Sequence, residues 1–241
     1  MQQVHAATPW METFTGDMNG WSTSGSPAWS SAVNRAQVTF AASPTPQAST
    51  LLATGTLFSA AFTGDYTSAG IALMGFRFRA EQVLPSVLTV RWTSKSTGYF
   101  RNVQSDVLAT GQWYQFRFLM TSKEAGGWDG DPAGLFTNVL ADVDTVAIAV
   151  TKPATVSPST FMVDDVFIER LPAAISVNSG TGSTRRILWT HLLTNMVYGL
   201  ESSTNLAGPW ASEQSFTATN RQQETESSVG GYWYYWRLLM L

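Results

Sequence analysis

Five arginines recur in one short stretch of the chain, at polar positions within strand-like runs. A guanidinium group presents a rigid fork of donors that matches a carboxylate or a sulfate in bidentate geometry, which lysine does not. Residues 71–120 hold six basic and two acidic side chains, a local charge of +4, although the whole chain has a net charge of −3. We predict that these arginines bind an anionic polysaccharide. The alternative is that they pair with acidic or polar neighbours across strands. The five are Arg77, Arg79, Arg91, Arg101 and Arg117.

Aromatic side chains beside turns add a second kind of chemistry. Sugar binding needs flat apolar rings that stack on the CH faces of a sugar, with hydrogen-bonding groups nearby. Trp128 is flanked by glycines and Tyr99 lies beside a hairpin tip, so both are predicted to be exposed and to stack on a ligand. Trp21, Trp92 and Trp113 sit at pattern positions that are typical of a core.

The arginines lie on a block of short strands between residues 71 and 119. Apolar and polar residues alternate there with period two, which is typical of strands with one face in the core and the other in solvent. If the apolar residues of these runs point inward, all five arginines point outward. The predicted inward residues are Phe76, Phe78, Val90, Trp92, Phe100, Phe116 and Phe118.

The bulk composition argues against several kinds of partner. Only 13% of the residues are charged, against roughly 25% in typical domains, so Ser, Thr, Asn, Gln and Gly must cover the surface. A net charge of −3 predicts no attraction for nucleic acid. Cysteine is absent, which excludes disulfides and thiolate metal sites. No apolar run is long enough to predict a membrane span.

Catalysis has little support in the sequence. The two histidines lie in different segments, and no hydrolase, metalloprotease or phosphate-loop motif occurs. A glycosidase needs two carboxylates placed across a cleft, and Glu81 with Asp106 or Asp129 is left open as such a pair. We expect a protein that is not an enzyme.

Turn signals divide the chain into many short strands, with no sustained helical period. This pattern predicts an all-β chain of sandwiches or barrels. We expect an N-terminal extension over 1–9, a jelly-roll β-sandwich over 10–171 and a small immunoglobulin-like β-sandwich over 172–241. The boundary is placed at Pro172, after which five strand-like runs follow in about seventy residues.

Residues 10–170 resemble the jelly-roll, galactose-binding-like carbohydrate-binding modules of secreted bacterial proteins. Three pieces carry the resemblance, namely ETFTGDMNGW at 12–21, GQWYQFRF at 111–118 and FMVDDVFI at 161–168. Their order and spacing match the opening, middle and closing strands of such modules. The resemblance implies a secreted protein that binds a polysaccharide without cleaving it.

Residues 173–241 resemble a short C-terminal module of secreted bacterial surface proteins. The matching runs are YGLESSTNLAGPW at 198–210 and YYWRLLM at 234–240. The segment VHAA at 4–7 also looks like the end of a cleaved signal peptide, with an ordinary polar N-terminus as the alternative. We expect a secreted or cell-surface location.

The resemblance to carbohydrate-binding modules also implies a structural calcium ion between the first and last strands. The corresponding ligands are Glu12 and one of Asp164 or Asp165, since adjacent strand residues point to opposite faces. Thr15 stands where many such modules have a second acidic residue. A D-x-D loop at Asp129 and Asp131 is another candidate, although turn-forming aspartates are the favoured interpretation there.

Three functions remain from the sequence. The first is a secreted, non-catalytic carbohydrate-binding protein. The second is a structural surface or matrix protein that self-associates through its sandwiches. The third is a polysaccharide-degrading enzyme on the same scaffold.

Overall fold

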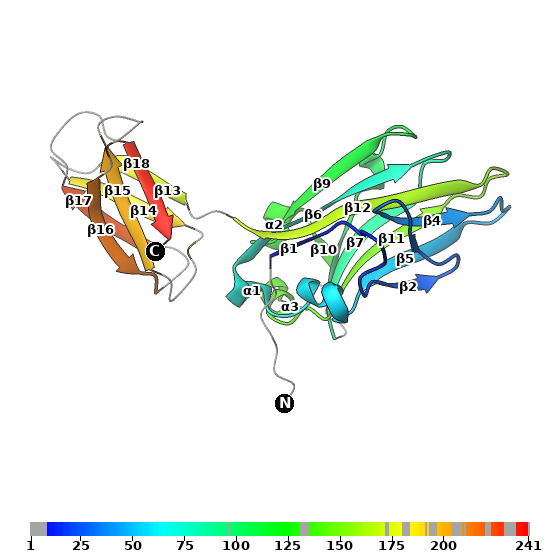
Figure 1. The fold of residues 1–241 in the computed structure, drawn as a ribbon, viewed down its shortest axis with the longest axis horizontal. Helices are drawn as coiled ribbons and strands as arrows, with labels where there is room; N and C mark the ends of the chain where they lie inside the picture. Colours follow the sequence, from blue (N-terminus) through cyan, green and yellow to red (C-terminus); the bar gives the residue numbers. More distant parts are fainter. Residues whose placement is uncertain are drawn as a thin grey trace. The chain divides into compact units, whose positions relative to one another are not determined.

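The chain divides into two compact units, Met1–Arg170 and Leu171–Leu241, and each is described by itself. The boundary expected from the sequence lies one residue further along. Residues 1–8, with the expected extension and the VHAA segment, lie outside the described part. The computed structural model describes residues 9–95, 97–130, 135–171, 174–179, 184–190, 192, 197–203, 209, 211–219, 223–228 and 235–240 (Figure 1).

One antiparallel sheet of the first unit, here called sheet I, is built around the longest strand, β12 (Ser159–Arg170). One edge of β12 pairs with β6 (Ile71–Ala80), and β6 pairs with β9 (Trp113–Leu119). The other edge of β12 pairs first with β4 and then with β1. The remaining strands are β1 (Trp10–Glu12), β3 (Ser30–Ser31) and β4 (Ala36–Phe40).

The second antiparallel sheet, sheet II, has the order β10-β8-β7-β11-β5-β2. Its central strand β11 reads TVAIAVTK, and its buried and half-buried residues alternate along the whole length. This is the pattern of a strand with one face in the core. The strands are β2 (Ser22–Gly25), β5 (Gln47–Ala53), β7 (Val87–Ser94), β8 (Thr97–Asn102), β10 (Asp129–Gly130) and β11 (Thr145–Lys152).

Consecutive segments of the chain pass repeatedly from one sheet to the other, as in a jelly roll (Figure 1). The crossings carry only short helices. They are η1 (Leu57–Phe62), α1 (Tyr66–Ala69), η2 (Gln104–Asp106), α2 (Lys123–Gly126) and α3 (Phe136–Leu140).

The inner faces of the two sheets enclose one hydrophobic core. It contains six of the seven residues predicted to point inward, and Phe100 is the exception. Each buried large side chain stabilises the fold by roughly 1.5–3 kcal/mol relative to an exposed one. The six are Phe76, Phe78, Val90, Trp92, Phe116 and Phe118.

The second unit consists of two three-stranded antiparallel sheets, with the orders β13-β14-β17 and β16-β15-β18. Trp189 of the first sheet meets Phe216 of the second edge to face, with ring centroids 4.5 Å apart, so the sheets pack on each other. The sequence predicted all of these strands except β17, whose QETESS run has no apolar residue. The strands are β13 (Ala174–Ser179), β14 (Thr184–Thr190), β15 (Val197–Ser203), β16 (Ala211–Thr217), β17 (Gln223–Ser228) and β18 (Tyr235–Met240).

The prediction of an all-β sandwich is confirmed, whereas the immunoglobulin-like character of the second unit stays a prediction. In the part of the chain that the structure describes, no helix has the combined length and hydropathy needed to cross a membrane.

Candidate functional site

The outer face of sheet II carries a row of side chains that runs across all six strands. Residues paired directly across antiparallel strands lie on the same face. The register pairs Phe100 with both Asp129 and Arg91, and it continues from Arg91 through β11 and β5 to β2. This transverse row consists of Asp129, Phe100, Arg91, Ala147, Leu52 and Ser22.

Phe100 and Arg91 are the exposed centre of the transverse row. Phe100 is 39% exposed, and Arg91 beside it is also exposed. A Cβ atom added at Gly98 would lie 2.7 Å from Arg91 Nε and 2.9 Å from Nη2, so the guanidinium group rests on the backbone of Gly98. Among the residues that the structure describes, Arg91 makes no hydrogen bond or ion pair.

Small side chains surround the transverse row on both sides. One flanking row holds Asn102, Thr89, Ala149 and Thr50, and the other holds Gly98, Thr93 and Thr145. All of these side chains are short, so the face beside Phe100 is shallow and lined by hydroxyl and methyl groups.

This combination suits a sugar. An exposed ring can stack on the apolar CH face of a pyranose, while Arg91 donates hydrogen bonds and Asp129 accepts them on either side of the ring. A shallow floor leaves room for neighbouring units of a chain. The site therefore offers apolar contact and both kinds of hydrogen-bonding group within one row.

Phe100 was not predicted as a site residue because the alternating pattern assigned the wrong face to β8. Only two residues separate Ser94 from its partner Thr97, so the pairing continues from Trp92 to Tyr99 and from Arg91 to Phe100. A two-residue hairpin loop fixes this register, and it was the signal that could have found Phe100. The prediction of an exposed Tyr99 is wrong: Tyr99 is 2% exposed and packs edge to face on Phe136.

Trp128 is also not the stacking residue that was predicted. It is 2% exposed, its ring centroid lies 3.4 Å from that of Trp92, and its Nε1 donates to the Leu119 carbonyl at 2.9 Å. The glycines before it end α2 instead of exposing the ring. Gly127 has φ +64°, a left-handed conformation that glycine adopts readily and that turns the chain back into the core.

Arg101 shares the inward face of β8 with Tyr99, so its predicted outward position is wrong. Its Nη1 donates to the carbonyl of Gly126, and its guanidinium lies 5.4 Å from the Phe118 ring centroid. Arg101 therefore holds α2 against the end of the sandwich.

The other three arginines belong to the outer face of sheet I, and each has a carboxylate partner. Arg77 pairs with Asp165 at 3.0 Å, Arg79 with Glu81 at 2.9 Å and Arg117 with Glu169 at 3.4 Å. Arg77 also covers the Trp113 ring, and Arg117 covers the Phe167 ring. The five arginines thus do not form one cationic groove. The alternative of cross-strand pairing holds for Arg77 and Arg117, whereas the partner of Arg79 lies two residues further along the chain.

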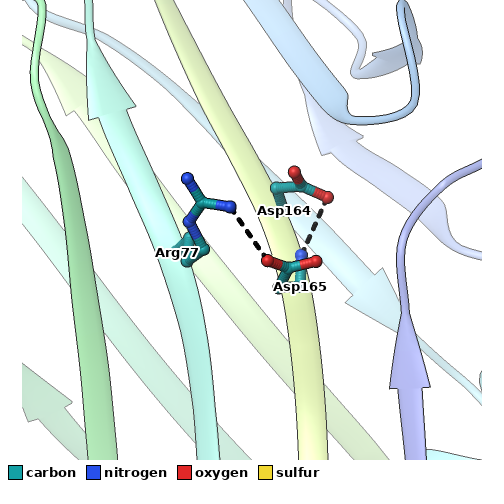
Figure 2. Close-up of polar contacts among 3 residues, drawn as sticks. All are labelled: Arg77, Asp164 and Asp165. Atoms are coloured by element: carbon teal, nitrogen blue, oxygen red, sulfur yellow. Dashed lines mark hydrogen bonds and ion pairs between the residues drawn. The ribbon is translucent and has the colours of Figure 1, made fainter.

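Asp164 and Asp165 lie at a β-bulge in β12, where two residues of β12 face one of β6 (Figure 2). Asp165 has φ +47°, which breaks the alternation, and both carboxylates are half-exposed on the side of Arg77. The expectation that they point to opposite faces is therefore wrong. Asp164 Oδ1 accepts a hydrogen bond from the Asp165 N–H at 2.9 Å. Partial burial, and secondarily the neighbouring Asp165 charge, raise the pKa of Asp164.

Glu12, the remaining predicted calcium ligand, lies on the inner side of sheet I. It is 2% exposed, and its Oε1 accepts from the Phe14 N–H at 2.6 Å and from Asn19 Nδ2 at 2.7 Å. Its Oε2 is buried and has no hydrogen-bond partner among the described residues. This orphaned oxygen fits a cation ligand, whereas Asp164 and Asp165 lie on the opposite face and do not join it.

Within the described ranges, no three His, Cys, Asp or Glu side chains cluster as the ligands of a metal ion would. In the D-x-D candidate, Asp129 belongs to the transverse row, and Asp131 lies outside the described residues.

No protein-family model matches the chain, and no curated protein matches it. Solved structures with a similar fold include an agarase, at 9% identity and a TM-score of 0.44 over 64% of this chain and 23% of the agarase. A family 61 carbohydrate-binding module solved with β-1,4-galactotriose has 14% identity and a TM-score of 0.36, covering 65% of this chain and 92% of the module. The family 30 module of a Clostridium thermocellum cellulosomal cellulase has 11% identity and a TM-score of 0.41, covering 68% and 98%. At these values the likenesses assign no family and no ligand to this chain.

Proposed function

We propose that the protein binds a polysaccharide on the outer face of sheet II, centred on Phe100. The observation that carries this proposal is the transverse row, where an exposed ring lies between a guanidinium group without a partner among the described residues and a carboxylate. The ring and the charged groups are both used when a sugar stacks on the ring and hydrogen-bonds to its neighbours.

Binding without cleavage is the activity that this row supports. Glycoside hydrolysis requires two carboxyl groups on either side of the scissile bond. The transverse row contains one carboxylate, Asp129. The other charged member, Arg91, cannot act as a general acid or base because it stays protonated.

Affinity electrophoresis in gels that contain a panel of soluble polysaccharides tests the proposal. We expect retardation in at least one gel, and loss of that retardation in Phe100→Ala. Leu119→Ala is the matched control, because Leu119 is 37% exposed on the outer face of sheet I. Retardation that survives Phe100→Ala would place the site elsewhere, and no retardation by any polysaccharide would overturn the proposed function.

Self-association is a second candidate, and one exposed apolar patch favours it. The patch consists of Trp10, Leu57 and Phe58, which are 39–80% exposed. The Trp10 and Phe58 rings stack with centroids 5.7 Å apart and an angle of 15°. Contiguous exposed apolar residues of this kind mark interaction surfaces.

Light scattering over a range of protein concentrations tests self-association. The double substitution Trp10→Ser with Phe58→Ser is expected to abolish any concentration-dependent assembly. Val156→Ser is the control, since Val156 is 92% exposed and lies outside the patch. A wild-type protein that stays dispersed at high concentration would argue against this function.

A structural calcium ion, if bound, would be held by Glu12 without Asp164 or Asp165. The buried, unpartnered Oε2 of Glu12 supports this, since calcium prefers carboxylate and carbonyl oxygens. We expect calcium to raise the melting temperature of the wild type and not that of Glu12→Gln. A melting temperature that does not respond to calcium or to a chelator would exclude the ion.

We also propose that the protein is exported, which its low content of charged residues and its lack of cysteine support. Cell fractionation of a producing bacterium tests this, and recovery from the cytosol would contradict it.

A further inference from the structure

The charge of the outer face of sheet II indicates what kind of polysaccharide it can bind. Among the outward strand residues of this face, two carry a charge, Arg91 and Asp129, and their signs are opposite. The remaining outward residues are threonine, serine, alanine, asparagine, leucine, valine, glycine and phenylalanine. An acidic polysaccharide would present many negative charges to a face with no net charge.

Arg91 lies over the backbone of Gly98. A Cβ atom at position 98 would lie 2.7 Å from Nε and 2.9 Å from Nη2, so any side chain there would have to displace the guanidinium group. The planar fork of a guanidinium group suits two hydrogen bonds to neighbouring sugar oxygens, whereas the ammonium group of a lysine would serve equally well for charge neutralisation. Gly98 thus leaves open the space that the guanidinium group of Arg91 occupies.

The direction of the row indicates how the ligand lies. Six strands spaced about 4.8 Å apart make the row roughly 24 Å long from Asp129 to Ser22. The side chains beyond Arg91 are Ala147, Leu52 and Ser22, and Ser22 is exposed on β2, the edge strand of sheet II. Such a row can accommodate the interior of a polysaccharide chain.

We propose that the ligand is a neutral polysaccharide whose chain lies across the strands of sheet II and is bound through its interior. Arg91 donates hydrogen bonds to sugar hydroxyl or ring oxygens, and Asp129 accepts hydrogen bonds from sugar hydroxyls. This inference rests on the proposed function and adds the charge class of the ligand, its direction and the role of Gly98.

Isothermal titration of the full chain with neutral polysaccharides and with carboxylated or sulfated ones tests the charge class. The affinity for a neutral ligand is expected to change less than about twofold between about 0.05 M and 0.5 M NaCl, because hydrogen bonds to uncharged groups are not screened. Tight binding to an acidic polysaccharide that weakens steeply with salt would overturn the inference and leave the proposed function standing.

Substitutions of Arg91 distinguish the two-point hydrogen bonding of the guanidinium group from the effect of its positive charge. If the fork matters, Arg91→Lys and Arg91→Gln both lose roughly tenfold in affinity for the neutral ligand. Gly98→Ala is expected to lose several-fold with Arg91 still present, because the added methyl group displaces the guanidinium. Full retention of affinity by Arg91→Lys would show that only charge is needed and would contradict this inference.

Oligosaccharides of increasing length test the direction of the ligand. Affinity is expected to rise with length until the row is filled, and reduction of the chain end is expected to leave it unchanged. Equal affinity for a monosaccharide and a long chain would overturn the extended mode. Failure of every polysaccharide, acidic or neutral, would instead count against the proposed function itself.

Discussion

The two outer faces of the first sandwich each carry arginine beside phenylalanine, yet they differ in what surrounds that pair. On sheet I, Arg117 covers Phe167 and pairs with Glu169, so the ring is only 3% exposed. On sheet II, Arg91 lies on Gly98 and leaves Phe100 39% exposed. The same two residue types therefore stabilise the fold on one face and remain available to a ligand on the other.

The partner of the arginine decides between these outcomes. On sheet I, the carboxylate of Glu169 on β12 pairs with Arg117 on β9 and neutralises the guanidinium that lies over the Phe167 ring. The cross-strand neighbours of Arg91 are Phe100 and Ala147, which offer no charge. Whether an arginine is left free to contact a ligand thus depends on its cross-strand neighbours, and these are set by strand order.

The largest expected effect comes from exchanging the two phenylalanines for alanine. Phe167→Ala is expected to lower the free energy of unfolding by about 3 kcal/mol with unchanged affinity for the polysaccharide, since it empties a buried site. Phe100→Ala is expected to lower affinity at least tenfold with a change in stability under about 1 kcal/mol. Urea unfolding and isothermal titration measure the two quantities. If both variants lost both stability and affinity, Phe167 and Phe100 would not have the separate roles, in stability and in binding, that we expect of the two faces.

A smaller effect is expected from Arg117→Ala, which uncovers Phe167. The loss of the contact with the ring and of the partly exposed ion pair with Glu169 should cost about 1 kcal/mol of unfolding free energy. Arg117→Met is the matched control, because it keeps an apolar cover over the ring and should recover part of the loss. If Arg117→Ala weakened polysaccharide binding at unchanged stability, sheet I would have to be considered as a binding face.

The ion pair of Arg77 and Asp165 is expected to contribute less. Its side chains are 38% and 30% exposed, so solvent screens the pair. A double-mutant cycle with Arg77→Ala and Asp165→Ala should give a coupling of about 0.5 kcal/mol, which decreases at high salt. A coupling above about 2 kcal/mol would mean that the ion pair at the bulge contributes substantially to the stability of sheet I.

The smallest expected effect is the contribution of Asp164 to the pH dependence of the free energy of unfolding. Its pKa is raised in the folded state, so the folded protein binds more protons than the unfolded chain between the ordinary carboxyl pKa and the raised value. Stability therefore falls as pH rises through this window, and the destabilisation is complete above it. Asp164→Asn, which keeps an oxygen for the Asp165 N–H, should be slightly more stable than the wild type at neutral pH and equal to it below the window. Urea unfolding of both proteins over a pH series measures this. A difference that does not vary with pH would contradict it.

Prediction from the sequence worked for the interior of the sandwich and failed at its surface. Period-two alternation is a local property of each strand, so it identified six of the seven inward residues. Phe100 failed because the face of β8 depends on the hairpin register, and a shift by one residue exchanges the two faces. Of the residues predicted to bind the polysaccharide, only Arg91 therefore belongs to the candidate site. Phe100 and Asp129 were not predicted to bind it.

The sequence by itself determined that the chain is all-β, because alternation, turn residues and the lack of helical periodicity are all encoded locally. It also determined where Arg77, Arg79, Arg91, Arg101 and Arg117 lie along their strands. Only the tertiary structure decided that these residues belong to two different sheets and that one of them points inward. Strand order and register are set by long-range pairing, and these decide whether an arginine meets a carboxylate or an open ring.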